Sequence, residues 1–332
     1  MKGALRFFTA LPVLAATAWG ALALWYAGPG PEWARGTLAG AFGLGTLAGL
    51  LFFRPFRWVL AGWAMAFALL LVWWIQIPAS NNRDWAPEVA RLPSVEIHGD
   101  RLTFHNVRNF EYRTETDFSP RYEDRMVDLS RLRGLDLFVV YWGSPWIAHT
   151  IMSWQFEDSP PLAISIETRK RRGQQYSAVE GFFKQYELIY VVADERDVIR
   201  LRTTYRGEEV YLYRLAVPIP QARALLLDYV KTMNRLVEHP KFYFAIRDNC
   251  TTSIRHHVKR VDPGAPPFDW RFIANGYGDQ MLYERGRIDT RLPFEELKRK
   301  SLVNERAKAA GQDPGFSQRI REGLPDPRAA RS

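Results

Sequence analysis

One cysteine stands at the start of a short polar stretch, in a setting typical of a nucleophile. Cys250 is the only cysteine among 332 residues, and it follows Asn249, a favoured helix N-cap. Ile254 and Val258 continue from Cys250 at the i, i+4, i+8 spacing of a helix with one packed face. A helix N-terminus lowers the pKa of a thiol through its unpaired N–H groups and dipole, so a reactive thiolate is expected. The alternative interpretation is a small buried core residue.

A cysteine nucleophile needs a nearby base, and the two histidines closest in sequence do not qualify. His256 and His257 follow Cys250 on the same predicted helix. At about 1.5 Å rise per residue they lie roughly 9–10 Å along the axis from it, too far for a hydrogen bond. We expect them to be cations near the helix end, and adjacent residues on a helix diverge too far to form a metal site.

His149 is a better candidate for the base. It belongs to the more polar face of a predicted strand at 148–156, which pairs with a second strand at 162–169. If the hairpin turns near residue 158 or 159, Glu167 falls opposite His149 or one same-face position away. The carboxylate of Glu167 would then fix the tautomer of the imidazole. The alternatives are a satisfied histidine in a sheet and a solvent-facing glutamate.

A run of four cations, residues 169–172, follows this strand directly. We expect Arg169 and Lys170 to bind a lipid phosphate beside a membrane-facing site, because cationic side chains recognise phosphate oxygens. A solvated loop is the alternative. For the oxyanion we expect the Cys250 backbone N–H to donate, supported by Asn249.

The sequence predicts that the N-terminal quarter of the chain spans a membrane. Residues 7–31, 36–53 and 58–82 contain no charged side chain, and a helical span needs about 20 apolar residues. The middle segment is short and rich in glycine, which suits close helix packing. We therefore predict three transmembrane helices.

Basic residues set the expected orientation. Lys2 and Arg6 flank the first segment, and Arg54 and Arg57 lie between the second and third. With three spans both places lie on one side, which the positive-inside rule makes cytoplasmic. We expect a multi-pass protein of a bacterial inner membrane with its C-terminal domain in the periplasm. If the middle segment does not span, the domain faces inward.

Charge and composition restrict the partners. The formal net charge is +9 and 14% of residues are aromatic, but no nucleic-acid motif is present. A domain that acts at the surface of an anionic bilayer would carry the same positive charge. We therefore expect membrane lipids and lipoproteins as partners rather than nucleic acid. A single cysteine permits no intrachain disulfide. Nothing in the sequence indicates a metal or another cofactor.

The remaining chain predicts an α+β domain. We divide the sequence into a transmembrane region (1–78), a linker (79–93), the domain (94–290) and a charged tail expected to be disordered (291–332). Strands are expected at 95–98, 101–108, 126–129, 135–142, 148–156, 162–169, 186–193 and 208–217, and the clearest helix at 220–238.

Four segments, residues 141–150, 164–170, 207–215 and 248–252, resemble a known family in content and order. They are similar to the N-terminal periplasmic domain of the lipoprotein intramolecular transacylase family, Lnb, over about residues 91–286. The chain also looks like a permuted relative of the NlpC/P60 and lecithin–retinol acyltransferase cysteine enzymes. This resemblance implies a papain-like antiparallel-sheet domain with Cys250 as nucleophile, His149 as base and Glu167 as orienting group.

The resulting hypothesis is a periplasmic thiol acyltransferase or acyl hydrolase. Its thioester on Cys250 would form from the acyl ester of a lipoprotein or phospholipid. Two rivals stand beside it: an NlpC/P60-like peptidase or amidase acting on cell-wall peptide, and a non-catalytic membrane-tethered binding module. A polar groove at the active site would favour a peptide substrate, and an apolar tunnel would favour an acyl chain.

Overall fold

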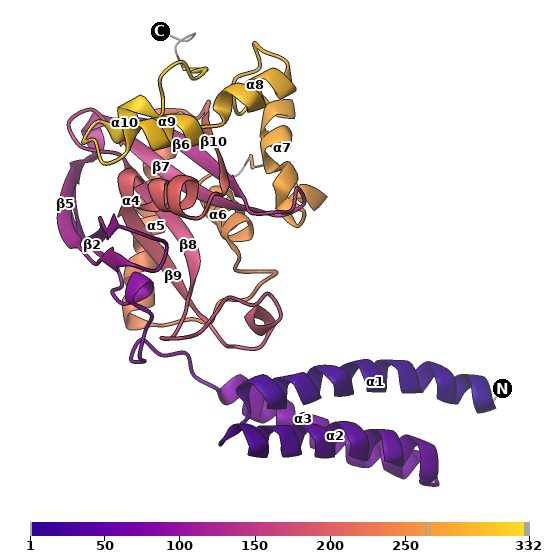
Figure 1. Cartoon of the computed structure of the whole chain (residues 1–332). Helices are drawn as coiled ribbons and strands as arrows, with labels where there is room; N and C mark the ends of the chain where they lie inside the picture. Colours follow the sequence, from indigo (N-terminus) through magenta and orange to yellow (C-terminus); the bar gives the residue numbers. More distant parts are fainter. Residues whose placement is uncertain (1, 263, 266, 329–332) are drawn as a thin grey trace. The chain divides into compact units, whose positions relative to one another are not determined.

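The computed structural model describes residues 2–262, 264–265 and 267–328 (Figure 1). Its contacts divide the chain into two units. The first comprises residues 1–80 together with 176–187, and the second comprises residues 81–175 together with 188–332. Each unit is described by itself below.

The first unit is a group of apolar helices, α1 (Lys2–Ala27), α2 (Glu32–Phe52) and α3 (Phe56–Gln76). All three are long and apolar enough to cross a membrane, as predicted, and they run side by side in Figure 1. The segment 176–187 packs on them through Phe183, whose ring stacks on Tyr26 with centroids 5.3 Å apart. The Lys184 ammonium donates to the Trp74 carbonyl oxygen at 2.6 Å.

An eight-stranded sheet forms the centre of the second unit. Its order is β1-β2-β9-β8-β7-β6-β10, with β5 paired to β2. The strands are β1 (Ser94–His98), β2 (Arg101–Arg108), β5 (Tyr122–Asp128), β6 (Leu132–Tyr141), β7 (Ala148–Phe156), β8 (Leu162–Arg169), β9 (Glu187–Asp194) and β10 (Glu209–Arg214); β3 (Glu111–Tyr112) and β4 (Phe118–Ser119) form a separate pair.

The sheet is mixed rather than purely antiparallel. The pairs β1–β2, β2–β5, β6–β7, β7–β8 and β6–β10 are antiparallel, whereas β2 and β9 meet in parallel at Arg108 and Ala193. Almost 80 residues separate these two strands, which leaves room for the long crossover that a parallel pair requires. The domain is therefore a mixed α/β fold.

Helices cover both faces of the sheet, so its central strands are buried on both sides. The helices are α4 (Glu195–Arg200), α5 (Ile219–Glu238), α6 (Cys250–Val261), α7 (Gly278–Glu284), α8 (Phe294–Ser301), α9 (Asn304–Ala310) and α10 (Phe316–Arg319). On one face Phe138 and Ile151 pack in one cluster with Ala307 of α9 and Phe316 of α10. The opposite face meets α5 and α6, which carry the candidate site.

Helix α5 confirms the helix predicted at 220–238. One of its faces is buried, and the buried residues are Ala222, Leu225, Leu226, Tyr229, Val230, Met233 and Leu236. The strands predicted at 95–98 and 101–108 are confirmed as β1 and β2, which pair across Gly99, whose φ is +64°.

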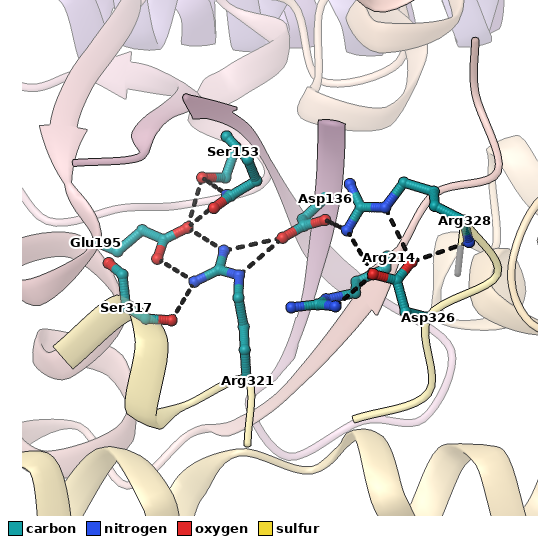
Figure 2. Close-up of polar contacts among 9 residues, drawn as sticks. Asp136, Ser153, Glu195, Arg214, Ser317, Arg321, Asp326 and Arg328 are labelled. Atoms are coloured by element: carbon teal, nitrogen blue, oxygen red, sulfur yellow. Dashed lines mark hydrogen bonds and ion pairs between the residues drawn. The ribbon is translucent and has the colours of Figure 1, made fainter. Parts of the chain in front are cut away.

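The tail expected to be disordered over 291–332 is folded in its described part, up to residue 328. Helices α8, α9 and α10 lie within it, and Figure 1 shows α9 and α10 against the sheet. Arg321 donates to Glu195 at 2.7 Å and to Asp136 at 2.9 Å, and neither carboxylate is exposed (Figure 2). The prediction was wrong because the tail's few apolar residues are spaced for separate short helices. Residues 329–332 lie outside the described part.

Candidate active site

Cys250 begins helix α6, and the local sequence explains why the helix begins there. The side-chain oxygen of Asn249 accepts from the Thr252 N–H at 2.9 Å, which is the predicted N-cap. The amide nitrogen of Asn249 donates to the Ala245 carbonyl oxygen at 2.9 Å. Both ends of this amide are therefore engaged. Asn249 supports the helix start and is not free to donate to an oxyanion, contrary to that part of our expectation.

The Cys250 thiol is buried and has a lowered pKa. Burial alone would raise the pKa, but the charge of His149 and hydrogen bonds from the His149 imidazole and from Thr150 lower it to about 6. The position at a helix N-terminus also favours a lower thiol pKa, because the first N–H groups of a helix have no intrahelical acceptor and stabilise negative charge. Among the groups that lower the pKa of the predicted nucleophile, the predicted base His149 has the largest effect.

His149 is part of a chain of polar contacts that continues away from the sulfur. Its Nε2 atom lies 2.7 Å from the Ser165 hydroxyl and 3.7 Å from the Glu167 carboxylate. The Ser165 hydroxyl donates to Glu167 at 2.7 Å.

The strand register accounts for this closeness. Strands β7 and β8 pair from Ile151↔Ser165 to Trp154↔Leu162, which centres the hairpin on residue 158, as expected. Extending the register by two residues brings Glu167 opposite His149. The predicted juxtaposition of these two side chains is confirmed.

Arg202 fixes the charge of Glu167. This arginine lies in a π-helical turn, Leu201–Tyr205, and donates to Glu167 at 3.0 Å and to Glu208 at 3.1 Å. Burial would raise the pKa of Glu167, but Arg202 and His149 hold it well below its usual range. Glu167 is thus a carboxylate at every pH of interest. Sequence reasoning missed Arg202, since nothing local to it marks its partner 35 residues earlier.

Asn275 ties the two halves of the site together. Its amide exchanges two hydrogen bonds with the Ala148 backbone, at 2.8 Å from the N–H and 2.7 Å to the carbonyl oxygen. The same amide nitrogen donates to the Thr251 hydroxyl at 2.7 Å. Ala148 precedes His149 and Thr251 follows Cys250, so one buried side chain joins the strand of the base to the helix of the nucleophile. The sequence carried no signal for this role.

Tyr229 of α5 places an unpaired hydroxyl near the thiol. The oxygen is buried and makes no hydrogen bond within the part of the chain that the structure describes. Burial raises the pKa of Tyr229 far above its usual value, and negative charge at Tyr190 and Cys250 adds to the effect. The phenol therefore stays neutral and can donate to negative charge at this place.

His257 is not the helix-terminal cation that we expected. It is buried, with its two ring nitrogens 2.6 Å from Asp228 and 2.7 Å from the Tyr190 hydroxyl. Its ring stacks on Tyr229 at 4.0 Å. Burial lowers the pKa of His257 to about 4, although Asp228 opposes this, so the ring is neutral and anchors α6.

Arg169 and Lys170 have partners within the chain. The Arg169 guanidinium is buried over the Trp85 ring and donates to the Val89 and Ala90 carbonyl oxygens at 3.0 and 2.7 Å. Arg169 thereby holds residues 89 and 90 against the domain. The segment 79–93 was expected to be a linker, but from residue 81 onwards it belongs to the domain. The ammonium of Lys170 lies 3.2 Å from Glu88. These contacts leave Arg169 unsuited to the predicted role at a lipid phosphate.

An apolar cavity of about 190 Å³ lies near the thiol, and its lining includes Thr150, Met152, Thr251, Ile254 and Phe272. The thiol does not line the cavity, but its Sγ atom lies 3.9 Å from the hydroxyl of Thr251, which does. Its walls come from β6, β7, α5, α6 and the segment 272–287. A cavity of this composition accommodates hydrocarbon better than a peptide backbone, which needs hydrogen-bonding partners.

Comparison with known proteins identifies one family. Residues 118–276 match the sequence profile of the Lnb N-terminal periplasmic domain. Neither a curated protein nor a solved structure matches the chain. The matched range includes Cys250, His149, Glu167 and Asn275, and it is narrower than the resemblance drawn from the four segments. Over residues 118–276, slightly less than half of its length, the chain is similar to the Lnb N-terminal periplasmic domain family.

Proposed function

We propose that this protein is a membrane-anchored thiol acyltransferase or acyl hydrolase that works through a thioester on Cys250. The observation that carries the proposal is a thiol whose pKa is lowered by His149 and whose Sγ atom lies 3.9 Å from Thr251, a residue that lines an apolar cavity. The acyl donor would be an ester of a phospholipid or lipoprotein in the membrane that the apolar helices cross.

The first half-reaction would transfer the acyl group to sulfur. The Cys250 thiolate attacks the ester carbonyl carbon, and the Cys250 backbone N–H at the helix start donates to the oxyanion. The C–O bond to the glycerol then breaks, and the imidazolium of His149 gives its proton to the departing alkoxide. Glu167 keeps the imidazole oriented through Ser165.

The second half-reaction would release the acyl group. An acceptor hydroxyl, amine or water gives its proton to His149 and attacks the thioester carbonyl, and Cys250 leaves as a thiolate. Transfer and hydrolysis share this chemistry and differ only in which acceptor reaches the site.

The cavity favours an acyl substrate over the peptide of the rival hypothesis. Its lining offers few polar groups, whereas a peptidase must satisfy the backbone N–H and C=O groups of its substrate. The interaction of His149 with Cys250 weighs against a non-catalytic binding module. The order of a strand histidine before an Asn-Cys helix start supports a permuted NlpC/P60-like, papain-like arrangement as part of the same proposal.

The helices and the matched family support a location in an inner membrane with the domain in the periplasm. Three helices long enough to cross a membrane precede a domain whose family is periplasmic. With Lys2, Arg6, Arg54 and Arg57 on the cytoplasmic side, three spans deliver the domain to the periplasm of an inner membrane.

A chain-length series tests the substrate class. Acylation by p-nitrophenyl esters of two to sixteen carbons would be followed in detergent for the native protein and for Ile254→Trp, which fills the cavity one turn beyond Cys250. We expect kcat/KM to rise with chain length in the native protein and the preferred chain to shorten in the variant. Lys259→Ala, on the exposed side of the same helix, is the matched control. Equal rates for all chains, with cleavage of a cell-wall peptide, would favour the peptidase.

A further inference from the structure

We propose that the catalytic domain itself enters the surface of a phospholipid bilayer, through an apolar rim beside the cavity. The rim consists of Trp146, Ile147, Phe268, Trp270 and Ile273. The exposed fractions of these residues are 57%, 53%, 59%, 56% and 64%, respectively. The inference deepens the proposed function, on which its choice of ligand rests, by stating how an acyl chain passes from the bilayer to Cys250.

Two loops from distant parts of the sequence build the rim. Trp146, in the β6–β7 loop, lies edge-to-face on Tyr277 at 5.4 Å, and Trp270 packs on the same ring at 5.6 Å. The Gly276 N–H donates to the Trp146 carbonyl oxygen at 3.0 Å. A Cβ atom at Gly276 would lie 2.0 Å from the Pro145 carbonyl oxygen, so only glycine permits this approach. The two loops that carry the exposed side chains are therefore held against each other.

The rim is continuous with the cavity. Phe272 lies between Trp270 and Ile273 in the chain, and its buried ring lines the cavity. Phe268 packs against Phe272 with centroids 6.2 Å apart. An apolar path thus runs from exposed aromatic side chains into the cavity, whose lining includes Thr251, 3.9 Å from the Cys250 sulfur.

Arg255 supplies a cation at the same place. Its guanidinium lies over Phe272 at 5.0 Å and over Phe268 at 5.7 Å. Its Nε atom is buried without a hydrogen-bond partner, and no ion pair to it occurs within residues 2–262, 264–265 and 267–328. Arg285 also lines the cavity, but its guanidinium is paired with Asp269 at 2.9 Å. Arg287 lines the cavity as well, but Arg255 is the lining cation that contacts the rim, through Phe268.

This combination matches a phospholipid surface. Exposed Trp side chains favour the membrane–water interface, and an arginine beside them suits a headgroup phosphate. An acyl chain entering the cavity would leave its phosphate near Arg255. The same chain carries three helices long and apolar enough to cross a membrane, so the domain is tethered to any bilayer that they enter. A protein partner or a second copy could cover aromatic side chains too, but neither explains the continuity with a hydrocarbon-lined cavity.

Fluorescence depth measurement tests the inference in the full-length chain. In a Cys250→Ser background no native thiol remains, so Trp146→Cys and Ile273→Cys can each be labelled with an environment-sensitive NBD probe. Met126→Cys on β5 is the matched control, because Met126 is a comparably exposed apolar residue, 62% accessible, away from the rim. The proteins would be placed in nanodiscs containing phosphatidylglycerol and nitroxide-labelled lipid.

We expect blue-shifted emission and nitroxide quenching at positions 146 and 273, and neither at 126. Arg255→Gln should reduce the quenching at 273 severalfold, and Arg255→Lys should preserve most of it. Rim probes that resemble the probe at 126 would overturn the inference. Blue-shifted emission without lipid quenching would also overturn it, because a protein surface would then cover the rim. The inactive background makes this result independent of catalysis. Rim insertion here, together with a native protein that forms no acyl-enzyme in a separate mass-spectrometric assay, would refute the proposed function alone.

Discussion

The side-chain amide of Asn275 donates to the hydroxyl of Thr251 at 2.7 Å. The same amide holds both backbone groups of Ala148, so the residues next to Cys250 and His149 share one anchor. The distance between nucleophile and base is therefore set by a residue that belongs to neither element. This relationship makes Asn275 a positioning residue.

Asn275→Ala should lower the rate of acylation by about 100-fold, the loss expected when reacting groups move by about 1 Å. The pH at which Cys250 alkylates should rise in the same variant, because His149 would no longer lie close to the sulfur. Gln280→Ala, at an exposed position nearby, should change neither quantity. A folded variant with native rate and native alkylation midpoint would show that Asn275 has no positioning role.

Alkylation of Cys250 by iodoacetamide should follow a midpoint near pH 6, since the thiolate forms as the pH rises through the pKa of the group. In His149→Ala the midpoint should move above 8, because burial still raises the pKa and the opposing charge is gone. Mass spectrometry of samples quenched at each pH measures both curves. A native midpoint at the ordinary value of about 8.5 would contradict the proposed thiolate–imidazolium pair.

Arg202 should govern how the reaction responds to acid. In the native protein Arg202 keeps the pKa of Glu167 low, so the carboxylate stays charged as the pH falls. In Arg202→Met burial dominates and raises that pKa, so activity should be lost at a higher pH than in the native protein. The pH–rate profile measures this shift. Glu208→Gln, which contacts Arg202 but not Glu167, is the control, and superimposable profiles for Arg202→Met and the native protein would refute the role.

Local patterns were enough to predict the parts of the site that lie close in sequence. The alternation at 148–156 and 162–169, with a turn near 158, placed Glu167 opposite His149, and the Asn249 cap placed Cys250 at a helix start. The helical period over 220–238 predicted the position of α5. In each case, the physical cause lies within one hairpin or one helix.

The remaining features depend on contacts between distant segments. Asn275 and Arg202 act on residues far from them in sequence, and no periodicity marks either one. Arg169 follows a strand and resembles a surface cation, yet it is buried against residues 81–90. We predicted a disordered tail because Arg321 resembles a solvent-exposed cation in the sequence. It is a core residue only because Asp136 and Glu195, from distant strands and helices, form ion pairs with it.

Arg321→Ala should destabilise the domain by about 3–5 kcal/mol, because it leaves two buried carboxylates without their shared partner. Arg319→Ala removes an exposed ion pair with Asp313 from the same segment and should cost less than about 1 kcal/mol. Denaturation of the detergent-solubilised protein, followed by tryptophan fluorescence, compares the two variants. Equal stability would mean that the network in Figure 2 contributes little to the fold.

The central claim is an acyl thioester on Cys250, and intact-mass spectrometry tests it most directly. The detergent-solubilised full-length protein would be incubated with phospholipid or with diacylated lipopeptide, beside Cys250→Ser. We expect the native protein alone to gain the mass of an acyl chain, removable by hydroxylamine, and that mass identifies the chain donated. A native protein that gains no mass from either lipid, although its thiol alkylates rapidly at neutral pH, would contradict the account.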